Sequence, residues 1–540
     1  MKIKLMRCCA LVILGFITTL VQAQDYNNAQ QLAQRLRSLA SSSSSASLES
    51  LTKTLGGKDI WMLTLGTGDV DNKPAIAVVG GVEGKHLLGV EMAVRFAEDV
   101  IANRSELLEN TTFYVFPNMS PDATEQYFAA LKYGRSGNAK PTDDDRDGRL
   151  DEDPFEDLNG DGMITMMRVY DETGDWTTHA ADARVMVKAE KSKGEKGTYK
   201  YFTEGRDNDL DGKFNEDGQG GIHFNKSLTY EYAYFTPGAG EHPVSELENR
   251  ALLDVLYTKW NIFSVVTFGP GNNLSSPWKY NRAGASKRVV TSILNGDDDI
   301  NQLVSSKYNE IVGLKDAPRS GDQGGDFYQW AYFHFGKLSF GTPGWWVPTV
   351  KGDSTVAPNK DKNAEVNFIR WAAQEGINNA FVEWTAIDHP DFPGQKVEVG
   401  GVAPFLMMNP PLEKIGDLGE KHAEFIAELA GMQPEIKLVN VKSESVGKGL
   451  TRITADLYNA GTLPTHSTMG QRSRWLRRVK VALQLDGNQE VVSGRKVQLI
   501  RNVDGDEAQQ LTWLIKGKGS VTIEAGAPHT GIVSSSVDLK

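Results

Sequence analysis

The chain has 540 residues, of which 40% are hydrophobic, 24% charged and 9% aromatic. A chain of this length exceeds the size of one hydrophobic core, so we expect at least two domains. The composition excludes a disordered or fibrous protein. The formal net charge of -12 argues against nucleic acid or an anionic membrane surface as a partner.

The first residues predict a secretory signal peptide. Three basic residues precede an apolar run from about residue 10 to residue 20, and Val21-Gln22-Ala23 fits a small-x-small cleavage site. The run is too short for a membrane span, and no second long apolar stretch follows. We therefore expect residues 1–23 to be removed and the mature protein to be exported to the periplasm or the exterior, without a membrane span.

Both cysteines, Cys8 and Cys9, lie in this leader. The mature chain would therefore contain no disulfide and no cysteine-based metal site. Removal of the leader would also remove three positive charges and leave a net charge of -15.

The body of the chain is typical of an α/β protein. After an amphipathic stretch, the serine tract 41–45 indicates a flexible connection or a loop. Apolar strand-like runs then alternate with helical periodicity, which predicts a sheet with crossover helices. The predicted strands are residues 59–66, 75–81, 111–118, 261–269 and 337–343, and the predicted helices are 87–101, 245–260 and 327–336.

Two further regions differ in character from this α/β body, which we place at residues 24–432. Residues 138–230 are rich in Asp, Gly and Asn, and we expect an insertion organised by bound cations. From residue 433 to 540 apolar residues alternate by twos between turn residues, which predicts a β-sandwich. The sandwich carries no cluster of acids and histidines, so we interpret it as an accessory for packing or adhesion, with carbohydrate or envelope binding as a hypothesis.

The acidic insertion contains a threefold calcium-loop pattern. Oxygen-bearing side chains occupy alternate positions and a glycine takes the sixth, as in calcium loops of the EF type. The alternative is a set of solvated acidic turns. The residues are Asp143, Asp145, Asp147 and Gly148; Asp157, Asn159, Asp161 and Gly162; and Asp207, Asp209, Asp211 and Gly212.

Several segments together resemble the zinc carboxypeptidases of the carboxypeptidase A and B type, in particular long bacterial exported relatives with acidic insertions. They include GGVEGKHLLGVEMAVRFAEDV, FPNMSPDATEQY, HPVSELENRALLDVL, WAYFHFGKLSF and HPDFPGQKVEVGGVAPFLMMNPP. The resemblance spans most of the mature chain. It implies a mixed α/β sheet flanked by helices, and a zinc enzyme that removes C-terminal residues from peptides.

The positions of the family's catalytic residues are substituted. The family pattern Gly-x-His-x-x-Glu supplies two zinc ligands, and here Glu83 stands at the His place and His86 at the Glu place. The third ligand, a His, aligns with Gly269, and the catalytic Glu aligns with Pro343. Hydrolytic zinc needs three protein ligands, an open water position and a base. We therefore predict that the usual catalytic site has been lost.

The resemblance also points to substrate-binding residues. The family's Asn-Arg pair, which binds the substrate carboxylate, appears as Asn225-Lys226, and lysine keeps the charge without the two-pronged grip of arginine. Arg135 stands where the transition-state arginine is expected. Trp345 and Trp346 either form the floor of the cleft or pack in the core.

Two functions remain open. One is a pseudo-peptidase that binds a peptide or an envelope-derived ligand, in which Glu83 and His86 are an ordinary polar pair. The other is an active metallocarboxypeptidase in which these two residues hold zinc together with a further ligand, for instance His223. Its base would then be one of three carboxylates: Glu310, Glu365 or Glu383.

Overall fold

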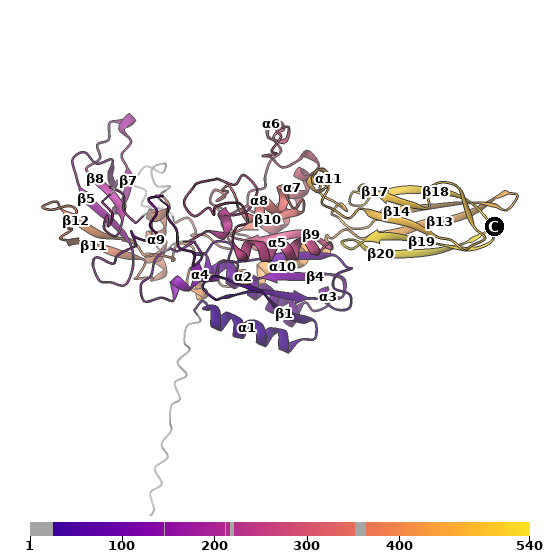
Figure 1. The fold of residues 1–540 in the computed structure, drawn as a ribbon, viewed down its shortest axis with the longest axis horizontal. Helices are drawn as coiled ribbons and strands as arrows, with labels where there is room; N and C mark the ends of the chain where they lie inside the picture. Colours follow the sequence, from indigo (N-terminus) through magenta and orange to yellow (C-terminus); the bar gives the residue numbers. More distant parts are fainter. Residues whose placement is uncertain (1–24, 145, 211, 216–220, 351–362) are drawn as a thin grey trace, which may run out of the picture.

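The computed structural model describes residues 25–144, 146–210, 212–215, 221–350 and 363–540. The predicted leader, residues 1–23, lies outside the described residues, as do Asp145 and Asp211 of the predicted calcium loops. Figure 1 shows a central α/β body with a smaller sheet on one side and a long β-sandwich on the other.

The central sheet has six strands in the order β1-β2-β4-β3-β9-β10. The strands β4, β3, β9 and β10 are mutually parallel, and β1 and β2 run antiparallel at one edge. Every residue of the four parallel strands is buried, because helices cover both faces of the sheet. Their bounds are β1 Ala46–Lys53, β2 Asp59–Leu65, β3 Ala75–Val79, β4 Thr112–Phe116, β9 Ile262–Phe268 and β10 Leu338–Thr342.

The flanking helices bury apolar residues in two core clusters. Helices α2, α7 and α10 contribute to one cluster, and α5 and α8 contribute to the other. The fold class expected from the sequence, a mixed sheet flanked by helices, is thereby confirmed. The helices are α1 Ala29–Ser42, α2 Leu87–Asn103, α3 Leu107–Asn110, α4 Pro121–Thr124, α5 Leu247–Thr258, α6 Arg282–Ala285, α7 Asn295–Val312, α8 Phe327–Phe333, α9 Ala364–Glu375, α10 Leu418–Gly431 and α11 Thr468–Ser473.

The serine tract is more ordered than the sequence indicated. Helix α1 continues to Ser42 and β1 begins at Ala46, so the tract reduces to a short turn. The main chain of Ser45 is tied to the sheet, because its carbonyl accepts a hydrogen bond from the Gly66 amide at 2.8 Å. Of the two alternatives that the sequence left open, the structure therefore shows a short loop at residues 43–45.

The acidic region, which we expected to be organised by bound cations, also forms regular strands. It contributes four strands to a second six-stranded sheet, and two further strands come from residues 381–402. Alternate residues of β5 and β12 bury a small core, and the Arg168–Glu398 ion pair joins these strands at 2.9 Å. In order across the sheet the strands are β11 Phe381–Ile387, β12 Val397–Val402, β5 Met166–Tyr170, β8 Tyr199–Thr203, β6 Trp176–His179 and β7 Asp182–Lys188.

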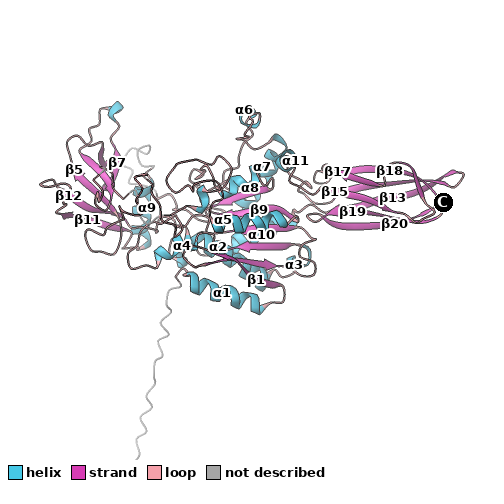
Figure 2. Ribbon diagram, in the orientation of Figure 1, coloured by secondary structure: helices cyan, strands magenta, loops and turns pink. Residues whose placement is uncertain are grey.

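The C-terminal region is a sandwich of two four-stranded sheets (Figure 2). Alternate residues of the strands face a common core that includes Ile453, Val481, Trp513 and Ile523. One sheet has the order β13 Ile436–Gly447, β14 Leu450–Asn459, β18 Ala508–Lys516 and β16 Glu490–Ser493; the other has the order β17 Val497–Ile500, β15 Val479–Gln484, β19 Gly519–Ala527 and β20 Gly531–Leu539.

Asp297, at the start of α7, joins the α/β body to the segment that leads into the sandwich. Its buried carboxylate accepts hydrogen bonds from the main-chain amides of Thr468 at 2.7 Å and Met469 at 3.1 Å. The Tyr332 hydroxyl donates a third bond at 2.7 Å. This carboxylate therefore fixes the first turn of α11 against the body.

Two buried histidines lie near this junction. The rings of His466 and His529 are 4.7 Å apart, and both are close enough to buried Lys337 for its charge to oppose their protonation. Burial lowers the pKa of His466 to about 4, and it lowers the pKa of Lys337 to about 8. The pKa of His529 is also well below its usual value because of burial. The structure therefore favours both imidazoles in the neutral form.

We expect the junction to lose stability in mild acid. Below about pH 6.5 the side chains of His466 and His529 are protonated in the unfolded chain but stay neutral in the folded chain. Their contribution to the free energy of unfolding is therefore complete above that pH and is lost as the pH falls toward 4. In a His466→Gln/His529→Gln variant, the difference in unfolding free energy between pH 7 and pH 5 should shrink by about 1–2 kcal/mol. Urea titrations at both pH values measure it. His242→Gln, on an exposed loop, is the control, and an unchanged pH dependence in the double variant would contradict the assignment.

Candidate functional site

The parallel strands bring the family-aligned positions to one edge of the central sheet. Val79 of β3 pairs with Thr267 of β9, and Phe268 of β9 pairs with Thr342 of β10. The segments that follow these strands therefore meet at the carboxyl edge of the sheet, where ligands of α/β folds bind. They carry Glu83, His86, Gly269 and Pro343.

His86 immediately precedes α2 and is 1% exposed. Its Nε2 lies 3.1 Å from the carbonyl oxygen of Pro343. A carbonyl only accepts, so Nε2 carries the proton, and the buried Nδ1 has no hydrogen-bond partner among the described residues. Burial lowers the pKa of His86 to about 4. The side chain is thus a neutral imidazole with one unused acceptor nitrogen.

Glu83 is also buried, with 7% exposure. The hydrogen bond that joins Glu83 and His86 runs between main-chain atoms, from the His86 amide to the Glu83 carbonyl at 3.0 Å. The side-chain atom Glu83 Oε1 has no hydrogen-bond partner among the described residues. The structure therefore brings these residues together in one turn without a hydrogen bond between their side chains.

Position 269 has no room for the histidine that is the third zinc ligand in the family. A Cβ atom on Gly269 would lie 2.5 Å from Cγ2 of Val82, which is closer than side chains pack. The Gly269 amide donates to the Thr342 carbonyl at 3.0 Å, so the main chain is held in place there. The side chain of Val82 therefore fills the space into which the side chain of a metal-binding histidine at position 269 would project.

The residues at this edge do not fit a catalytic zinc ion. Glu83 and His86 supply at most two ligands, Gly269 supplies none, and Pro343 cannot act as a base. Within the described ranges, no group of three or more His, Cys, Asp or Glu side chains is arranged to hold a metal ion. We therefore derive no hydrolytic step through zinc.

A cavity of about 310 Å³ lies next to His86. The indole groups of Trp345 and Trp346 border it, and each is also anchored: Trp345 packs against Trp371 with ring centroids 5.2 Å apart, and Trp346 Nε1 donates to the Lys315 carbonyl at 2.7 Å. The tryptophans thus serve both roles that the sequence left open. The remaining lining is Pro270, Asp316, Pro318, Arg319, Gly321, Pro343, Val347, Ala364, Asn367, Met407 and Met408.

One wall of the cavity is held by Asn409. Its Oδ1 accepts from the Leu88 amide at 3.0 Å, and its Nδ2 donates to the Lys85 carbonyl at 2.8 Å. These bonds fix the turn that carries Met407 and Met408 against the start of α2. Sequence reasoning included this segment in the family resemblance but did not identify the methionines as cavity residues, because nothing local indicates what they face.

Arg319 was also missed by sequence reasoning. It is an exposed residue at the cavity, in a loop between α7 and α8, and Asp316 borders the same cavity. Among the described residues, Arg319 has no ion-pair or hydrogen-bond partner. No motif surrounds it, so only the tertiary structure places its guanidinium beside the two tryptophans.

The predicted substrate residues lie elsewhere and contact main-chain atoms. Arg135 donates to the carbonyls of Gly137 and Asn138 at 3.1 and 2.5 Å. Asn225 Oδ1 accepts from the Phe327 amide at 2.9 Å, and Lys226 Nζ donates to the Pro237 carbonyl at 3.0 Å. None of the three borders the cavity beside His86.

The acidic loops are turns in which carboxylates accept main-chain amides. Asp157 accepts from Gly160, Asp161 and Gly162 at 2.7–3.1 Å. The other two loops share one bond of this kind, from the sixth-position glycine to the first aspartate: Gly148 to Asp143 at 3.1 Å and Gly212 to Asp207 at 2.9 Å. Two further side chains of the loops also accept hydrogen bonds from main-chain amides: Asp147 from Arg149 at 2.7 Å and Asn159 Oδ1 from Asp161 at 3.0 Å. Asp209 lies within the third loop, between Asp207 and Gly212.

Comparison with models of known protein families identifies the family to which the chain belongs. The model of the zinc carboxypeptidase family matches residues 32–340, more than half of the chain. The chain belongs to the zinc carboxypeptidase family. Residues 435–538 match a domain of unknown function, and no curated protein matches the chain. Within the described part of this family member, no helix is long and apolar enough to cross a membrane.

Solved structures of metallocarboxypeptidases are among those similar to this chain. Thrombin-activatable fibrinolysis inhibitor is 10% identical, with a TM-score of 0.41, over 75% of this chain and 74% of its own. Carboxypeptidase A from Helicoverpa armigera is 10% identical, with a TM-score of 0.37, over 65% and 73%. The metallo-carboxypeptidase from Burkholderia cenocepacia is 13% identical, with a TM-score of 0.30, over 58% and 59%. These identities are too low to transfer the role of any residue.

We expect Gly269→Ala to destabilise the protein by about 1–3 kcal/mol, because the new methyl group would overlap with Val82. The cost should fall sharply in a Val82→Ala background, and a double-mutant cycle by urea unfolding measures this coupling. Gly487→Ala is the control, since a Cβ there meets nothing within 4 Å. Equal costs of Gly269→Ala in both backgrounds would show that Val82 does not block the position.

Proposed function

We propose that this chain is an exported, non-hydrolytic member of the zinc carboxypeptidase family that binds a peptide or an envelope-derived peptide end. One observation carries the proposal: the space for the third zinc ligand at Gly269 is filled by Val82, and Pro343 stands where the catalytic carboxylate is expected. The fold retains a cavity at the same edge of the sheet, so binding without cleavage is the activity that this geometry supports.

The cavity lining supports a ligand with an apolar side chain and a carboxylate. Trp345, Trp346, Met407 and Met408 offer aromatic and thioether surface to an apolar group. Arg319 has no carboxylate partner among the described residues and can pair with a free chain terminus.

The alternative is an active metallocarboxypeptidase, which family membership favours. It requires a third ligand beside Glu83 and His86. His223 does not border the His86 cavity, and its buried ring lies against Gly238. The three alternative bases do not border it either: Glu310, Glu365 and Glu383. The arrangement of the described residues thus supports the non-hydrolytic function better.

Export and calcium binding are further parts of the proposal. The basic and apolar pattern of residues 1–23 supports a leader, and the repeated loop pattern supports calcium in a structural role. In such loops bound calcium would offset the repulsion between neighbouring carboxylates.

We expect elemental analysis of the purified mature protein to find far less than one zinc per chain, because the site offers too few ligands. Calcium should be retained after mild dialysis and decrease in an Asp157→Ala/Asp161→Ala variant. N-acylated dipeptides that end in Phe, Arg or Glu should remain uncleaved.

A Glu83→Ala/His86→Ala variant is the matched test of the alternative, with His242→Ala as control. A zinc content near one ion per chain that is lost in the Glu83→Ala/His86→Ala variant, but not in the control, would support the active enzyme instead. Release of a C-terminal residue by the unmodified chain, also lost in that variant, would overturn the non-hydrolytic function.

We expect peptides with a free C-terminal Leu or Phe to change the tryptophan fluorescence of the protein, because Trp345 and Trp346 border the cavity. C-terminal amidation of the peptide or an Arg319→Gln substitution should each weaken binding about tenfold, as a lost charged pair predicts. Arg282→Gln, at the exposed start of α6, is the control. Equal affinity for the free and amidated peptides would exclude the role of Arg319.

A further inference from the structure

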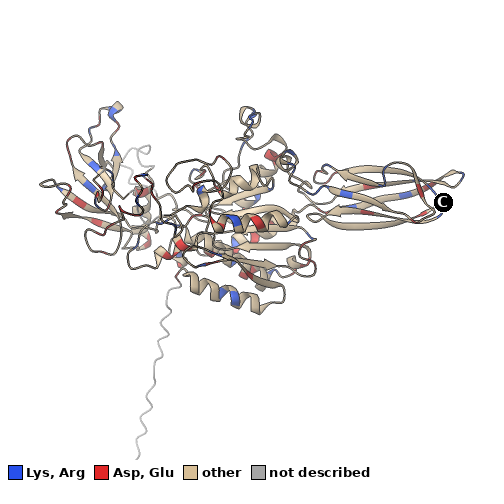
Figure 3. Cartoon of the chain, in the orientation of Figure 1, with Lys and Arg blue, Asp and Glu red and all other residues tan. Residues whose placement is uncertain are grey.

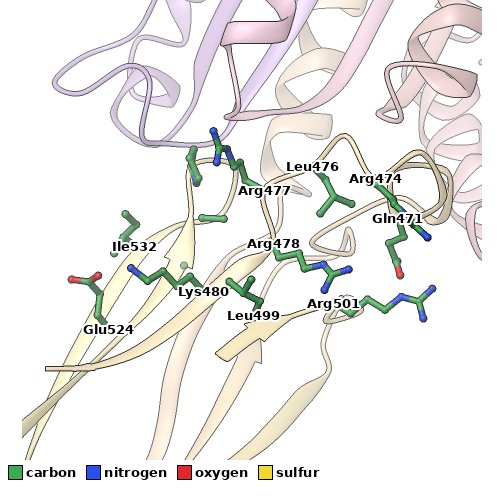
Figure 4. A pocket seen from close by; sticks show the side chains of 13 residues that line it. Gln471, Arg474, Leu476, Arg477, Arg478, Lys480, Leu499, Arg501, Glu524 and Ile532 are labelled. Carbon is green, nitrogen blue, oxygen red and sulfur yellow. The ribbon is translucent and has the colours of Figure 1, made fainter. Parts of the chain in front are cut away.

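A basic pocket of about 560 Å³ lies on the C-terminal sandwich, far from the cavity beside His86 in sequence (Figure 4). Its floor is the outer face of the β17-β15-β19-β20 sheet, and its wall is the segment that leads from α11 into β15. On the floor Lys480 pairs with Leu499 on one side and with Gly526 on the other, and Gly526 pairs with Ile532. Leu499, Lys480, Gly526 and Ile532 therefore form one row across the sheet.

The pocket concentrates positive charge on a protein that is acidic as a whole; Figure 3 shows the Lys and Arg residues of the chain in blue and the Asp and Glu residues in red. Five cationic side chains line it, against the single carboxylate of Glu524: Arg474, Arg477, Arg478, Lys480 and Arg501. The ion pairs between described residues in this part of the chain involve none of the five. Arg477 is partly engaged, with its guanidinium 4.1 Å from the ring centroid of Trp260. The other four remain available to an anionic ligand.

Two of the arginines that line the pocket, Arg478 and Arg501, come from different segments of the chain. Arg478 precedes β15 and Arg501 follows β17, and Figure 4 shows both side chains extending toward the same side of the pocket. Guanidinium groups bind carboxylates through two parallel hydrogen bonds. A pair of arginines in this arrangement favours a ligand with more than one acidic group.

The pocket also exposes large aliphatic side chains. Leu499 is 60% exposed and Ile532 is 57% exposed, although the outward positions of a sandwich strand are usually polar. Leu476 adds a third aliphatic side chain. Exposed apolar surface of this kind, rimmed by charges, is typical of an interaction site.

The lining narrows the class of ligand. No aromatic side chain lines the pocket, so it lacks the stacking surface on which nucleobases bind. Its concave shape does not match a flat bilayer, and the net charge of -12 disfavours an anionic membrane.

We propose that this pocket binds an extended acidic polypeptide segment in which carboxylates alternate with aliphatic side chains. The carboxylates pair with Arg478, Arg501 and Lys480, and the aliphatic groups cover Leu499 and Ile532, so the segment crosses the outer face of the sheet along the row from β17 to β20. This interaction surface is independent of the cavity beside His86 and of the proposed function there.

The test uses the full mature chain and a fluorescein-labelled peptide of alternating Glu and Leu, with a Gln and Leu peptide as the uncharged probe. Fluorescence anisotropy should show binding of the Glu peptide alone, weakened about tenfold between ~50 and ~300 mM NaCl. Arg478→Gln/Arg501→Gln should weaken binding at least about tenfold. Lys442→Gln/Lys518→Gln, with the same change of charge at exposed positions elsewhere on the sandwich, should leave it unchanged.

A second double variant tests the contribution of the exposed aliphatic side chains to binding. Leu499→Ala/Ile532→Ala should weaken binding of the Glu and Leu peptide and leave poly-glutamate binding unchanged, because only the first probe has apolar side chains. These exposed substitutions leave the sandwich core intact, and a circular dichroism melt of each variant verifies folding.

Three results would overturn the proposal. They are equal binding of the Gln and Leu peptide, an arginine variant that is folded and binds normally, and binding of inorganic phosphate, heparin or phosphatidylglycerol vesicles without binding of the Glu peptide. The last result would assign the pocket to a different class of anion.

Discussion

The parallel alignment of β3, β9 and β10 is the constraint on which the rest of the site depends. Because these strands are fully buried and in register, the residues after them are brought to one edge of the sheet within a few ångströms of each other. At that edge Val82 packs where a side chain at position 269 would have to stand. A packed contact with Val82 thus occupies the space that a side chain at position 269 would need.

The same edge retains the features of a binding site. The His86 ring is held by the Pro343 carbonyl, so the residue at the place of the catalytic base now orients a neutral imidazole. The two tryptophans and the methionine turn enclose the adjoining cavity. Membership of the zinc carboxypeptidase family explains the architecture of this edge, whereas the proposal of a different chemistry rests on the identity of the four aligned residues.

The C-terminal sandwich carries a positively charged surface on a protein whose net charge is negative. Its basic pocket lies beside a junction that is held by Asp297 and contains the neutral pair His466 and His529. The junction positions the segment from α11 to β15, which forms the wall of that pocket. The proposed binding surface is therefore shaped partly by the packing of this domain against the α/β body.

The sequence by itself determined the α/β body, the sandwich and the family, because hydrophobic periodicity and contiguous motifs are local signals. The substitutions at Glu83, His86, Gly269 and Pro343 stay a prediction from the sequence. Only the tertiary structure decided the pairing of the acidic insertion with residues 381–402, since strand partners distant in sequence leave no local pattern. It alone placed Arg319 at the cavity and gathered the arginines on the sandwich. Sites built from separate loops are set by packing, which a periodic pattern does not encode.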